Sequence, residues 1–271
     1  MIPITDSEFT QLAAHIHKHY GILLKGDKQG LVAGRLSPVL HELGLPSFKA
    51  YLQYLQQDRT GEPAYTLLEK ITTNHTFFMR EQPHFHFMRE TALPYWKSQI
   101  RDRDLRIWSA GCSTGEEPYT IAMILHDFFA LEKGGWDSQV LATDISRKVL
   151  ETAERGVYPN ESLKALPTPW RMRYFQSWDE EHSVVVDKIR RDCIFRMLNL
   201  VDPVFPFKRK FHLVFCRNVM IYFDSVTKRE LILKFYDALE EGGYLFIGHS
   251  ESIHREESPF KYVQPAIYRK G

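Results

Sequence analysis

The chain has 271 residues, of which 44% are hydrophobic and 25% charged, a composition typical of soluble globular proteins. Its 35 basic and 34 acidic residues leave no overall field to attract nucleic acid or an anionic membrane. The three scattered cysteines, Cys112, Cys193 and Cys216, form neither a disulfide pattern nor a zinc pattern. Because there is also no signal-peptide pattern and no apolar run near the roughly 18 residues that span a bilayer, we expect a cytoplasmic protein with no membrane insertion and no metal.

Residues 1–72 are predicted to form a small helical domain. Apolar residues recur at helical spacing in four short stretches. Asp6 or Ser7 is the expected cap of the first helix, Gly44 follows the second, and Ser47 is the expected cap of the third. We therefore expect a bundle of four short amphipathic helices.

Residues 73–271 are predicted to form an α/β domain. Short continuous apolar runs, typical of parallel strands covered on both faces, alternate with helical patterns. The expected strands are 105–110, 140–143, 211–216 and 244–248. This alternation predicts a doubly wound sheet.

The segment 174–199 interrupts the alternation. Residues 183–186 and 194–197 have the pattern of strands and flank a charged stretch at 187–192. We expect these two strands to pair antiparallel and to form a small β-subdomain inserted in the α/β domain.

The strand expected at 105–110 runs into a glycine turn, Gly111-Cys112-Ser113-Thr114-Gly115. Glu116 and Glu117 follow this turn, at the start of a helix. Here α/β folds bind nucleotide-type ligands, and the backbone at Gly111 comes close to the ligand. The spacing fits neither the dinucleotide fingerprint nor a P-loop, and carboxylates in place of lysine favour a positively charged ligand. The alternative is that the glutamates only complement the helix dipole, which is worth roughly 0.3–1 kcal/mol.

Asp144 ends the second predicted strand. An acid at this position can accept hydrogen bonds from ribose hydroxyls. It could instead cap the following helix, a role for which Ser146 competes. Together, the glycine turn, the acids after it and Asp144 indicate a nucleoside with a cationic tail, and S-adenosylmethionine is such a ligand.

Six motifs resemble those of the chemoreceptor methyltransferases, the CheR family. They lie, in order, at residues 72–81, 109–119, 142–145, 199–200, 216–223 and 248–251. The resemblance covers essentially the whole chain and implies a class I methyltransferase-like fold. It further implies methyl transfer from S-adenosylmethionine to glutamate side chains of chemotaxis receptors, giving glutamate 5-O-methyl esters and S-adenosylhomocysteine.

The resemblance also assigns residues to the cofactor. These are Asn74, Thr76, Arg80, Gly111, Glu117, Asp144, Asn199, Leu200, Arg217 and Asn218. Glu117 is preferred to Glu116, although the sequence does not separate the two.

Arg80 and Tyr222 are the expected catalytic residues. A glutamate side chain, with a reference pKa of about 4.3, is ionised at neutral pH and needs no strong base to attack a methyl group on sulfur. Catalysis can then rest on alignment and desolvation, for which an orienting cation and a hydroxyl are suitable. Taken singly, Arg80 could be a surface residue in an exposed ion pair and Tyr222 a core residue.

The expected methyl acceptor is a carboxylate. Amine-directed methyltransferases commonly have Asn/Asp-Pro-Pro-Tyr at the fourth strand end, where this chain has 216–219 with Arg217. An arginine suits a carboxylate better than an amine, which argues against methylation of nucleic-acid bases. The alternative function is a non-catalytic module that binds S-adenosylmethionine or S-adenosylhomocysteine and signals through a partner protein.

The resemblance implies that the partners are the cytoplasmic methylation helices of chemoreceptors. Lys25, Lys28 and Arg35 could meet these acidic helices, or could form an ordinary solvated face. The turn of the predicted β-subdomain has no glycine, which resembles family members that do not use a tail peptide of the receptor. We expect a monomer.

Overall fold

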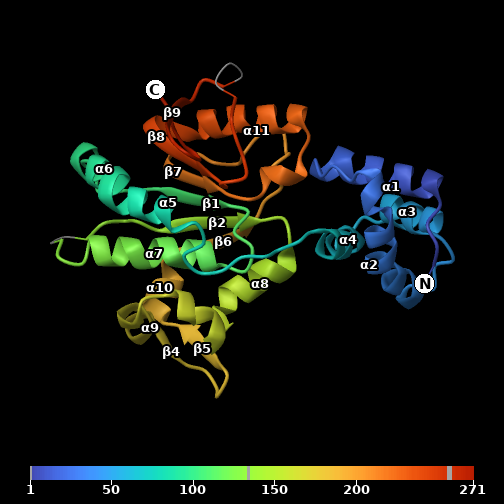
Figure 1. The fold of residues 1–271 in the computed structure, drawn as a ribbon, viewed down its shortest axis with the longest axis horizontal. Coiled ribbons are helices and arrows are strands. Elements are labelled where there is room, and N and C mark those ends of the chain that lie inside the picture. The colour runs from blue at the N-terminus through green and yellow to red at the C-terminus, as the bar shows by residue number, and fades with distance from the viewer. Residues whose placement is uncertain (1, 133–134, 255–257) are drawn as a thin grey trace. The chain divides into compact units, whose positions relative to one another are not determined.

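The computed structural model describes residues 2–132, 135–254 and 258–271. The chain divides into two compact units (Figure 1). One comprises Met1–Thr73 and Tyr222–Thr227, and the other comprises Asn74–Ile221 and Lys228–Gly271. None of the described helices combines the length and the apolar character needed to cross a bilayer.

The first unit is built from helices. They are α1 (Asp6–Tyr20), the 3-10 turn η1 (Gly26–Lys28), α2 (Gln29–Glu42), α3 (Phe48–Gln57) and α4 (Glu62–Ile71). Their apolar stripes meet in a core in which Leu12, Leu36, Tyr51 and Leu67 are completely buried. The predicted all-helical unit is thus confirmed.

The helix caps show where local patterns suffice. Ser47 caps α3 as predicted, because its hydroxyl accepts a hydrogen bond from the Ala50 N–H at 3.2 Å. The cap predicted for α1, Asp6 or Ser7, is wrong. Thr5 holds that position in a capping box: its hydroxyl accepts from the Glu8 N–H at 3.3 Å, and the Glu8 carboxylate accepts from the Thr5 N–H at 3.0 Å.

A short segment from late in the chain completes the first unit. The Leu23 N–H donates to the Tyr222 carbonyl at 2.8 Å, and Ile22 forms a β-bridge with Phe223. Nε2 of His17 lies 2.5 Å from the Asp224 carboxylate. The helical unit therefore holds the backbone on both sides of the Tyr222 side chain.

The second unit contains a seven-stranded sheet in the order β6-β2-β1-β7-β8-β10-β9. The strands are β1 (Ile107–Ala110), β2 (Val140–Asp144), β6 (Cys193–Met197), β7 (Phe211–Cys216), β8 (Leu239–Ile247), β9 (Lys261–Gln264) and β10 (Ile267–Arg269). The first five in the order pair in parallel, and β10 and β9 are antiparallel. The doubly wound sheet is confirmed, and its strand order reverses at β1, the usual position of a ligand site in such folds.

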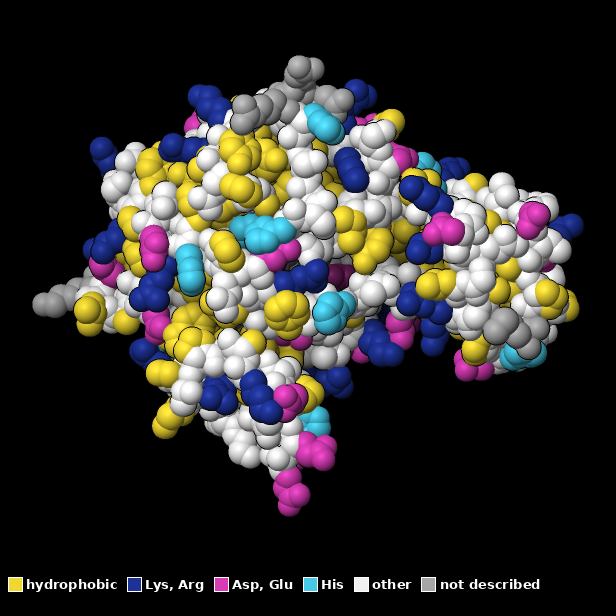
Figure 2. Space-filling view, in the orientation of Figure 1, with side chains coloured by type: hydrophobic (Ala, Val, Ile, Leu, Met, Phe, Trp, Pro, Cys, Tyr) yellow, Lys and Arg dark blue, Asp and Glu magenta, His cyan; other side chains and the backbone are white. Residues whose placement is uncertain are grey.

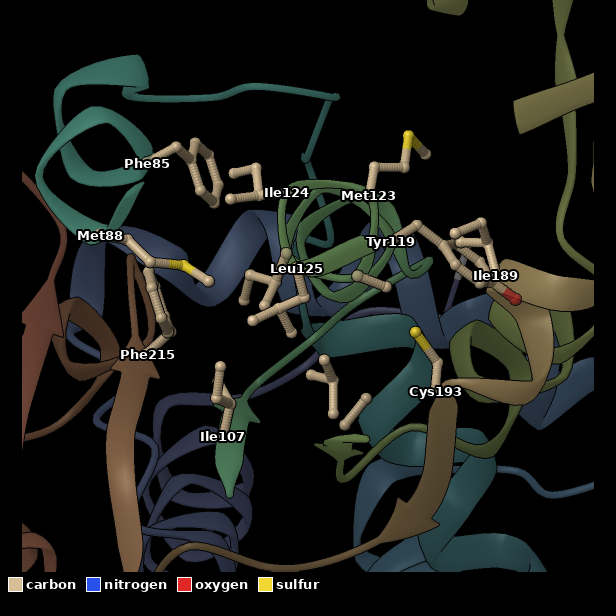
Figure 3. Packing of buried hydrophobic residues seen from close by; sticks show 14 of the residues in the cluster. Phe85, Met88, Ile107, Tyr119, Met123, Ile124, Leu125, Ile189, Cys193 and Phe215 are labelled. Atoms are coloured by element: carbon tan, nitrogen blue, oxygen red, sulfur yellow. The ribbon is translucent and has the colours of Figure 1, made fainter. Parts of the chain in front are cut away.

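Helices cover both faces of the sheet, with α11 on one face and α7 on the other (Figure 1). The helices after residue 73 are α5 (Gln82–Phe87), the π-helical turn η2 (Met88–Ala92), α6 (Leu93–Gln99), α7 (Glu116–Phe128), α8 (Arg147–Arg155), η3 (Asn160–Ala165), α9 (Thr168–Tyr174), α10 (Asp187–Arg191), η4 (Met220–Tyr222) and α11 (Ser225–Ala238). Successive strand residues point to opposite faces. Trp108 accordingly packs on Phe235 of α11, while Ile107 belongs to the core cluster with Leu125 of α7 (Figure 3).

The predicted β-subdomain exists, but its predicted strand pairing is wrong. A separate antiparallel sheet has the order β3-β5-β4, formed by β3 (Val157–Pro159), β5 (His182–Val185) and β4 (Phe175–Ser177). The stretch expected to pair with β5 is β6, which joins the main sheet parallel to β2. The charged stretch between them is the crossover helix α10, too short to show a helical period in the sequence.

Candidate active site

The glycine turn after β1 requires its glycines. Gly111 and Gly115 have φ values of 82° and 97°, in the left-handed region. A Cβ on Gly111 would lie 2.4 Å from the Val219 side chain, and one on Gly115 would lie 2.8 Å from Ala153. The Gly111 and Cys112 N–H groups both donate to the Thr143 carbonyl, at 2.8 and 2.9 Å, which draws the turn across the end of β2.

Asp144 lies where the turn meets β2. Its carboxylate accepts from the Ser113 N–H at 2.8 Å and from the Ser146 N–H at 3.0 Å, so it links the turn to the start of α8. Burial raises the pKa of Asp144, and these two hydrogen bonds offset part of the rise. Its backbone carbonyl accepts from the Leu198 N–H at 3.0 Å, which brings the end of β6 alongside.

Asn199 and Leu200 follow that strand end. Leu200 is buried, and its carbonyl accepts a hydrogen bond from the Lys234 ammonium at 2.5 Å. The Asn199 side-chain carbonyl accepts from the Val201 N–H at 3.3 Å. These two predicted cofactor residues therefore lie beside Asp144, at the same edge of the sheet.

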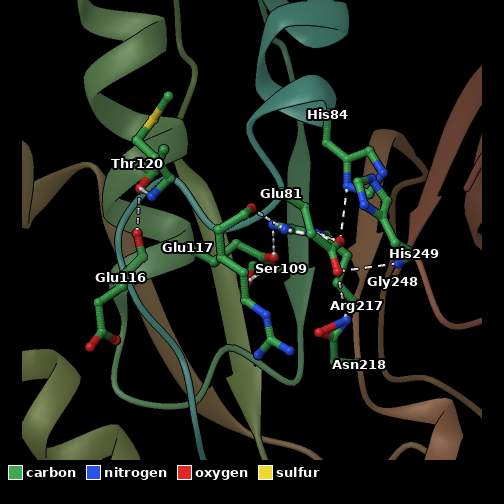
Figure 4. A network of polar contacts seen from close by, with 12 residues as sticks. Glu81, His84, Ser109, Glu116, Glu117, Thr120, Arg217, Asn218, Gly248 and His249 are labelled. Carbon is green, nitrogen blue, oxygen red and sulfur yellow. Dashed lines mark hydrogen bonds and ion pairs between the residues drawn. The ribbon is translucent and has the colours of Figure 1, made fainter. Parts of the chain in front are cut away.

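The two glutamates at the start of α7 point to different surroundings (Figure 4). The Glu116 carboxylate is buried and accepts from the Thr114 hydroxyl at 2.7 Å, and burial raises its pKa. The Glu117 carboxylate accepts from the Ser109 hydroxyl at 2.7 Å and from Nη1 of Arg217 at 2.8 Å. Glu117 thus belongs to the polar network at the strand ends, and Glu116 does not.

Arg217, directly after β7, is the centre of that network. Its Nε and Nη2 lie 3.2 Å from Oε2 of Glu81, and Nη2 also donates to the Arg80 carbonyl. Its Cζ lies 5.1 Å from the centroid of the Phe85 ring, and the Arg217 side chain is 4% exposed. Its charge is shared by Glu81 and Glu117, so the presence of Arg217 after this strand does not by itself indicate a carboxylate as the methyl acceptor.

Asn218 is fixed by two carboxylates, that of Glu81, which also binds Arg217, and that of Glu251. Its side-chain amide donates to Oε1 of Glu81 at 3.1 Å, and its backbone N–H donates to Glu251 at 3.0 Å. A Cβ on Gly248 would lie 2.0 Å from the Asn218 amide nitrogen, so the residue directly after β8 must be glycine. Glu251 also accepts from the Gly248 N–H at 2.6 Å, and burial raises its pKa.

The segment before α5 carries the remaining predicted residues. The Asn74 carbonyl accepts from the Ser113 hydroxyl at 3.0 Å, which joins this segment to the glycine turn. Arg80 donates to the His75 carbonyl at 2.6 Å, and its guanidinium lies 5.9 Å from the centroid of the Phe77 ring. Thr76 is half-buried between them in the chain.

Tyr222 is placed with the first unit. Its hydroxyl donates to the Thr73 carbonyl at 3.2 Å. This bond keeps the hydroxyl near the residue at which the chain passes from the first unit to the second.

The cysteines near the strand ends are packing residues. Burial raises the pKa of the Cys112 and Cys216 thiols well above the usual value, and both side chains are buried. Both thiols are therefore protonated and unreactive at neutral pH.

Sequence reasoning missed Glu81, Ser109 and Glu251 as residues of this site. All three lie inside motifs that the resemblance singled out, at 72–81, 109–119 and 248–251. The signal was an acid or hydroxyl next to an assigned residue, but which side chains meet depends on how strands far apart in the sequence come together.

Comparison with known proteins decides the family. The family model described as "CheR methyltransferase, SAM binding domain" matches residues 74–268. The model described as "CheR methyltransferase, all-alpha domain" matches residues 7–72. The chain belongs to the CheR methyltransferase family. It is a methyltransferase dependent on S-adenosylmethionine.

Relatives of this family are similar along their whole length. A chemotaxis protein methyltransferase of Borreliella burgdorferi is 40% identical over 100% of this chain and 96% of the relative. One of Escherichia coli is 35% identical over 98% of this chain and 92% of the relative. A solved structure of a glycopeptide N-methyltransferase with S-adenosylhomocysteine aligns with 65% of this chain and 55% of that protein's chain. The identity is 15% and the TM-score is 0.34.

The donor set of the CheR site fits its cofactor. S-adenosylmethionine carries a sulfonium and an ammonium group, and the strand ends present two carboxylates: that of Glu117, which pairs with Arg217, and that of Asp144, which accepts from two backbone N–H groups. The pKa of Asp144 is raised by burial, so a ligand that donates hydrogen bonds to its carboxylate would stabilise the ionised form.

Proposed function

We propose that the chain methylates glutamate side chains of chemoreceptors and forms glutamate 5-O-methyl esters. The observation that carries this proposal is the contrast between two arginines. Arg217 is paired with two carboxylates of its own chain, whereas among the described residues no carboxylate pairs with Arg80. Arg80 is therefore the cation suited to hold the carboxylate of an incoming glutamate.

In the proposed reaction, the main task of the protein is to position the substrate carboxylate against the methyl group. The cofactor supplies a methyl group on a positively charged sulfur. Arg80 binds the substrate carboxylate and turns one oxygen toward that methyl group, and the Tyr222 hydroxyl orients the same carboxylate. Because a glutamate is already ionised, no general base is needed, and the protonated thiols of Cys112 and Cys216 do not compete as nucleophiles.

The site assignments are part of this proposal. Asp144 and Glu117 hold the ribose and the charged part of the cofactor, and Asn199 and Leu200 flank its adenine. The other residues of the proposed cofactor pocket are Asn74, Thr76, Arg80, Gly111, Arg217 and Asn218. We further propose the boundaries 1–72 and 73–271 for the two domains, with a β-subdomain insertion at about 174–199.

We also propose that the enzyme is a cytoplasmic monomer that acts without a receptor tail peptide. Support for the last point comes from the short strands at the two edges of the β-subdomain. β3 and β4 have 3 residues each, and β3 ends in Pro159, which lacks an N–H. An added peptide strand would find few backbone partners there.

Transfer of labelled methyl groups tests the proposed reaction. Purified protein is incubated with labelled S-adenosylmethionine and membranes enriched in the cognate receptor. We expect label on the receptor that mild base releases, as it does from methyl esters. Label that resists base would indicate an amine acceptor, and binding without any transfer would indicate the non-catalytic signalling module.

A further inference from the structure

One guanidinium at the strand ends serves two carboxylates. Nη1 of Arg217 lies 2.8 Å from Oε2 of Glu117, and Nη2 lies 3.2 Å from Oε2 of Glu81. The three side chains are 4%, 12% and 14% exposed for Arg217, Glu117 and Glu81, so water screens them little. The trio therefore carries one net negative charge inside the protein.

The other partners of the two carboxylates leave this charge in place. Oε1 of Glu81 accepts from the Asn218 amide at 3.1 Å and from the His249 N–H at 3.2 Å, and Oε1 of Glu117 accepts from the Ser109 hydroxyl. All are neutral donors, which match an ionised carboxylate because it only accepts. None of them adds a positive charge.

His84 does not supply the missing positive charge either. Its Nδ1 is 3.5 Å from Oε2 of Glu81, and its ring is completely buried with neither nitrogen hydrogen-bonded among the described residues. Burial, with the positive charge of Arg217 and the neighbouring His249, lowers the pKa of His84 to about 3. His84 is therefore neutral at neutral pH.

The same place is a poor metal site. Ligand atoms of Glu81, His84 and His249 lie within 4.8 Å of one another, a spacing that a metal ion could bridge. Both oxygens of Glu81, however, already accept from donors, and the Arg217 guanidinium is bound to one of them. A metal ion would have to displace these donors and sit beside a fixed positive charge.

We propose that Glu81 is a specificity-determining residue that biases the cofactor pocket toward the positively charged S-adenosylmethionine over the neutral product. Without Glu81, Arg217 would neutralise Glu117 one to one. With Glu81 present, the Arg217 guanidinium pairs with both carboxylates. The side of the cofactor pocket formed by Glu117 then keeps a net negative charge. S-adenosylmethionine has one positive charge more than S-adenosylhomocysteine, so a negative charge at Glu117 raises the affinity for the cofactor relative to the affinity for the product.

Three variants vary the charge of the trio while retaining polar side chains of similar size. Glu81→Gln removes the net negative charge, Arg217→Gln adds one, and the double variant restores the wild-type value. Affinities of the free protein for S-adenosylmethionine and for S-adenosylhomocysteine are measured by calorimetry, which needs no methyl acceptor. Glu90→Gln, an exposed residue of the same segment, is the matched control.

We expect E81Q to lower the affinity for S-adenosylmethionine about tenfold more than the affinity for S-adenosylhomocysteine. R217Q should shift the ratio of these two affinities in the opposite direction. The double variant should return to the wild-type ratio, as should E90Q. Equal loss for both ligands in E81Q, or no recovery in the double variant, would show that Glu81 only supports the structure. If one variant does not fold, the remaining variants still show whether the ratio of the two affinities follows the net charge of the three side chains.

This inference rests on the proposed contact between Glu117 and the charged part of the cofactor, but not on the acceptor. If the receptor assay failed while the affinity ratio followed the charge, the substrate assignment alone would fall. If the receptor assay succeeded while the ratio ignored the charge, the role of Glu81 would fall.

Discussion

Arg80 and Arg217 show how the same residue type takes different roles at one site. Both follow from the motifs in the sequence, and both were assigned to the cofactor. Only the structure shows that the charge of Arg217 is taken up by Glu81 and Glu117, while Arg80 donates to a backbone carbonyl. The sequence carries residue types and their order, but the partners of a guanidinium come from strands that meet only in the fold.

Tyr222 offers a direct test of the proposed chemistry. Tyr222→Phe removes the hydroxyl that orients the substrate carboxylate, so turnover should fall about 10- to 100-fold. Affinity for S-adenosylmethionine should change less than about twofold, because the ring remains. Steady-state kinetics and calorimetry measure the two quantities, and Tyr54→Phe, on the exposed side of α3, serves as the control. Unchanged turnover in Y222F would remove Tyr222 from the mechanism.

Glu116 gives a prediction about pH. Burial raises the pKa of its carboxyl group above 4.5 in the folded state, so folding disfavours its ionised form. The folded state then binds more protons than the unfolded state just above pH 4.5, and stability is lost as the pH rises through the folded pKa. Glu116→Gln abolishes this loss and can still accept from Thr114.

Urea unfolding at a series of pH values measures the effect. The stability of E116Q relative to the wild type should rise as the pH increases above about 4.5 and then level off. Glu42→Gln, at the exposed end of α2, provides the comparison. A difference that does not change with pH would mean that Glu116 ionises as easily in the fold as in the unfolded chain.

At the scale of elements, the glycine turn between β1 and α7 determines where the ligand site can form. Gly115→Ala should destabilise the protein by more than about 2 kcal/mol and weaken cofactor binding, because the new Cβ lies 2.8 Å from Ala153 at a φ of 97°. Gly135→Ala is the matched control, with a φ of 64° and nothing within 4 Å of its Cβ. It should cost about 1 kcal/mol through the backbone alone.

Denaturant unfolding and cofactor titration separate these two contributions. Equal losses of stability in G115A and G135A would show that the turn tolerates a side chain. The close approach of α8 to Gly115 would then be without consequence.

The elements also show what the sequence could predict. Apolar runs identified β1, β2, β7 and β8, because buried parallel strands leave continuous hydrophobic stretches. They did not identify the partner of β6. An apolar strand pattern does not show whether a strand pairs with the preceding strand in the chain or, after a crossover helix, with a strand of another sheet. The five residues of α10 are too few for a period, so a crossover was taken for a turn.

At the scale of the whole molecule, the chain crosses between its two units more than once. The segment Tyr222–Thr227 belongs to the helical unit although the sheet unit precedes and follows it. Sequence reasoning placed the boundary near residue 72 and gave no sign of this return, because the contacts of Tyr222, Phe223 and Asp224 are with residues some 150 to 200 positions earlier.

Acid stability is a property of the whole sheet unit, and His212 contributes to it. Burial, with the charge of Arg106, lowers the pKa of His212 from 6.5 to about 4. The unfolded chain binds this proton first, so stability is lost as the pH falls from about 6.5 to 4, at about 1.4 kcal/mol per pH unit. His212→Asn retains an acceptor for the Arg106 N–H but cannot titrate.

The free energy of unfolding should therefore depend on pH less steeply in H212N, by about one proton, between pH 4 and 6.5. Chemical denaturation at each pH gives this slope. An unchanged slope would mean that His212 takes up its proton within the folded protein.

The most direct test of the central claim is the identity of the methylated atom. The receptor is treated with the enzyme and S-adenosylmethionine carrying a deuterated methyl group, and its peptides are sequenced by mass spectrometry. We predict the label on glutamate side chains of the cytoplasmic helices, lost after mild base and absent with Arg80→Ala enzyme. Label on lysine, arginine or a terminal amine, or no label on any cognate receptor, would contradict a protein-glutamate methyltransferase.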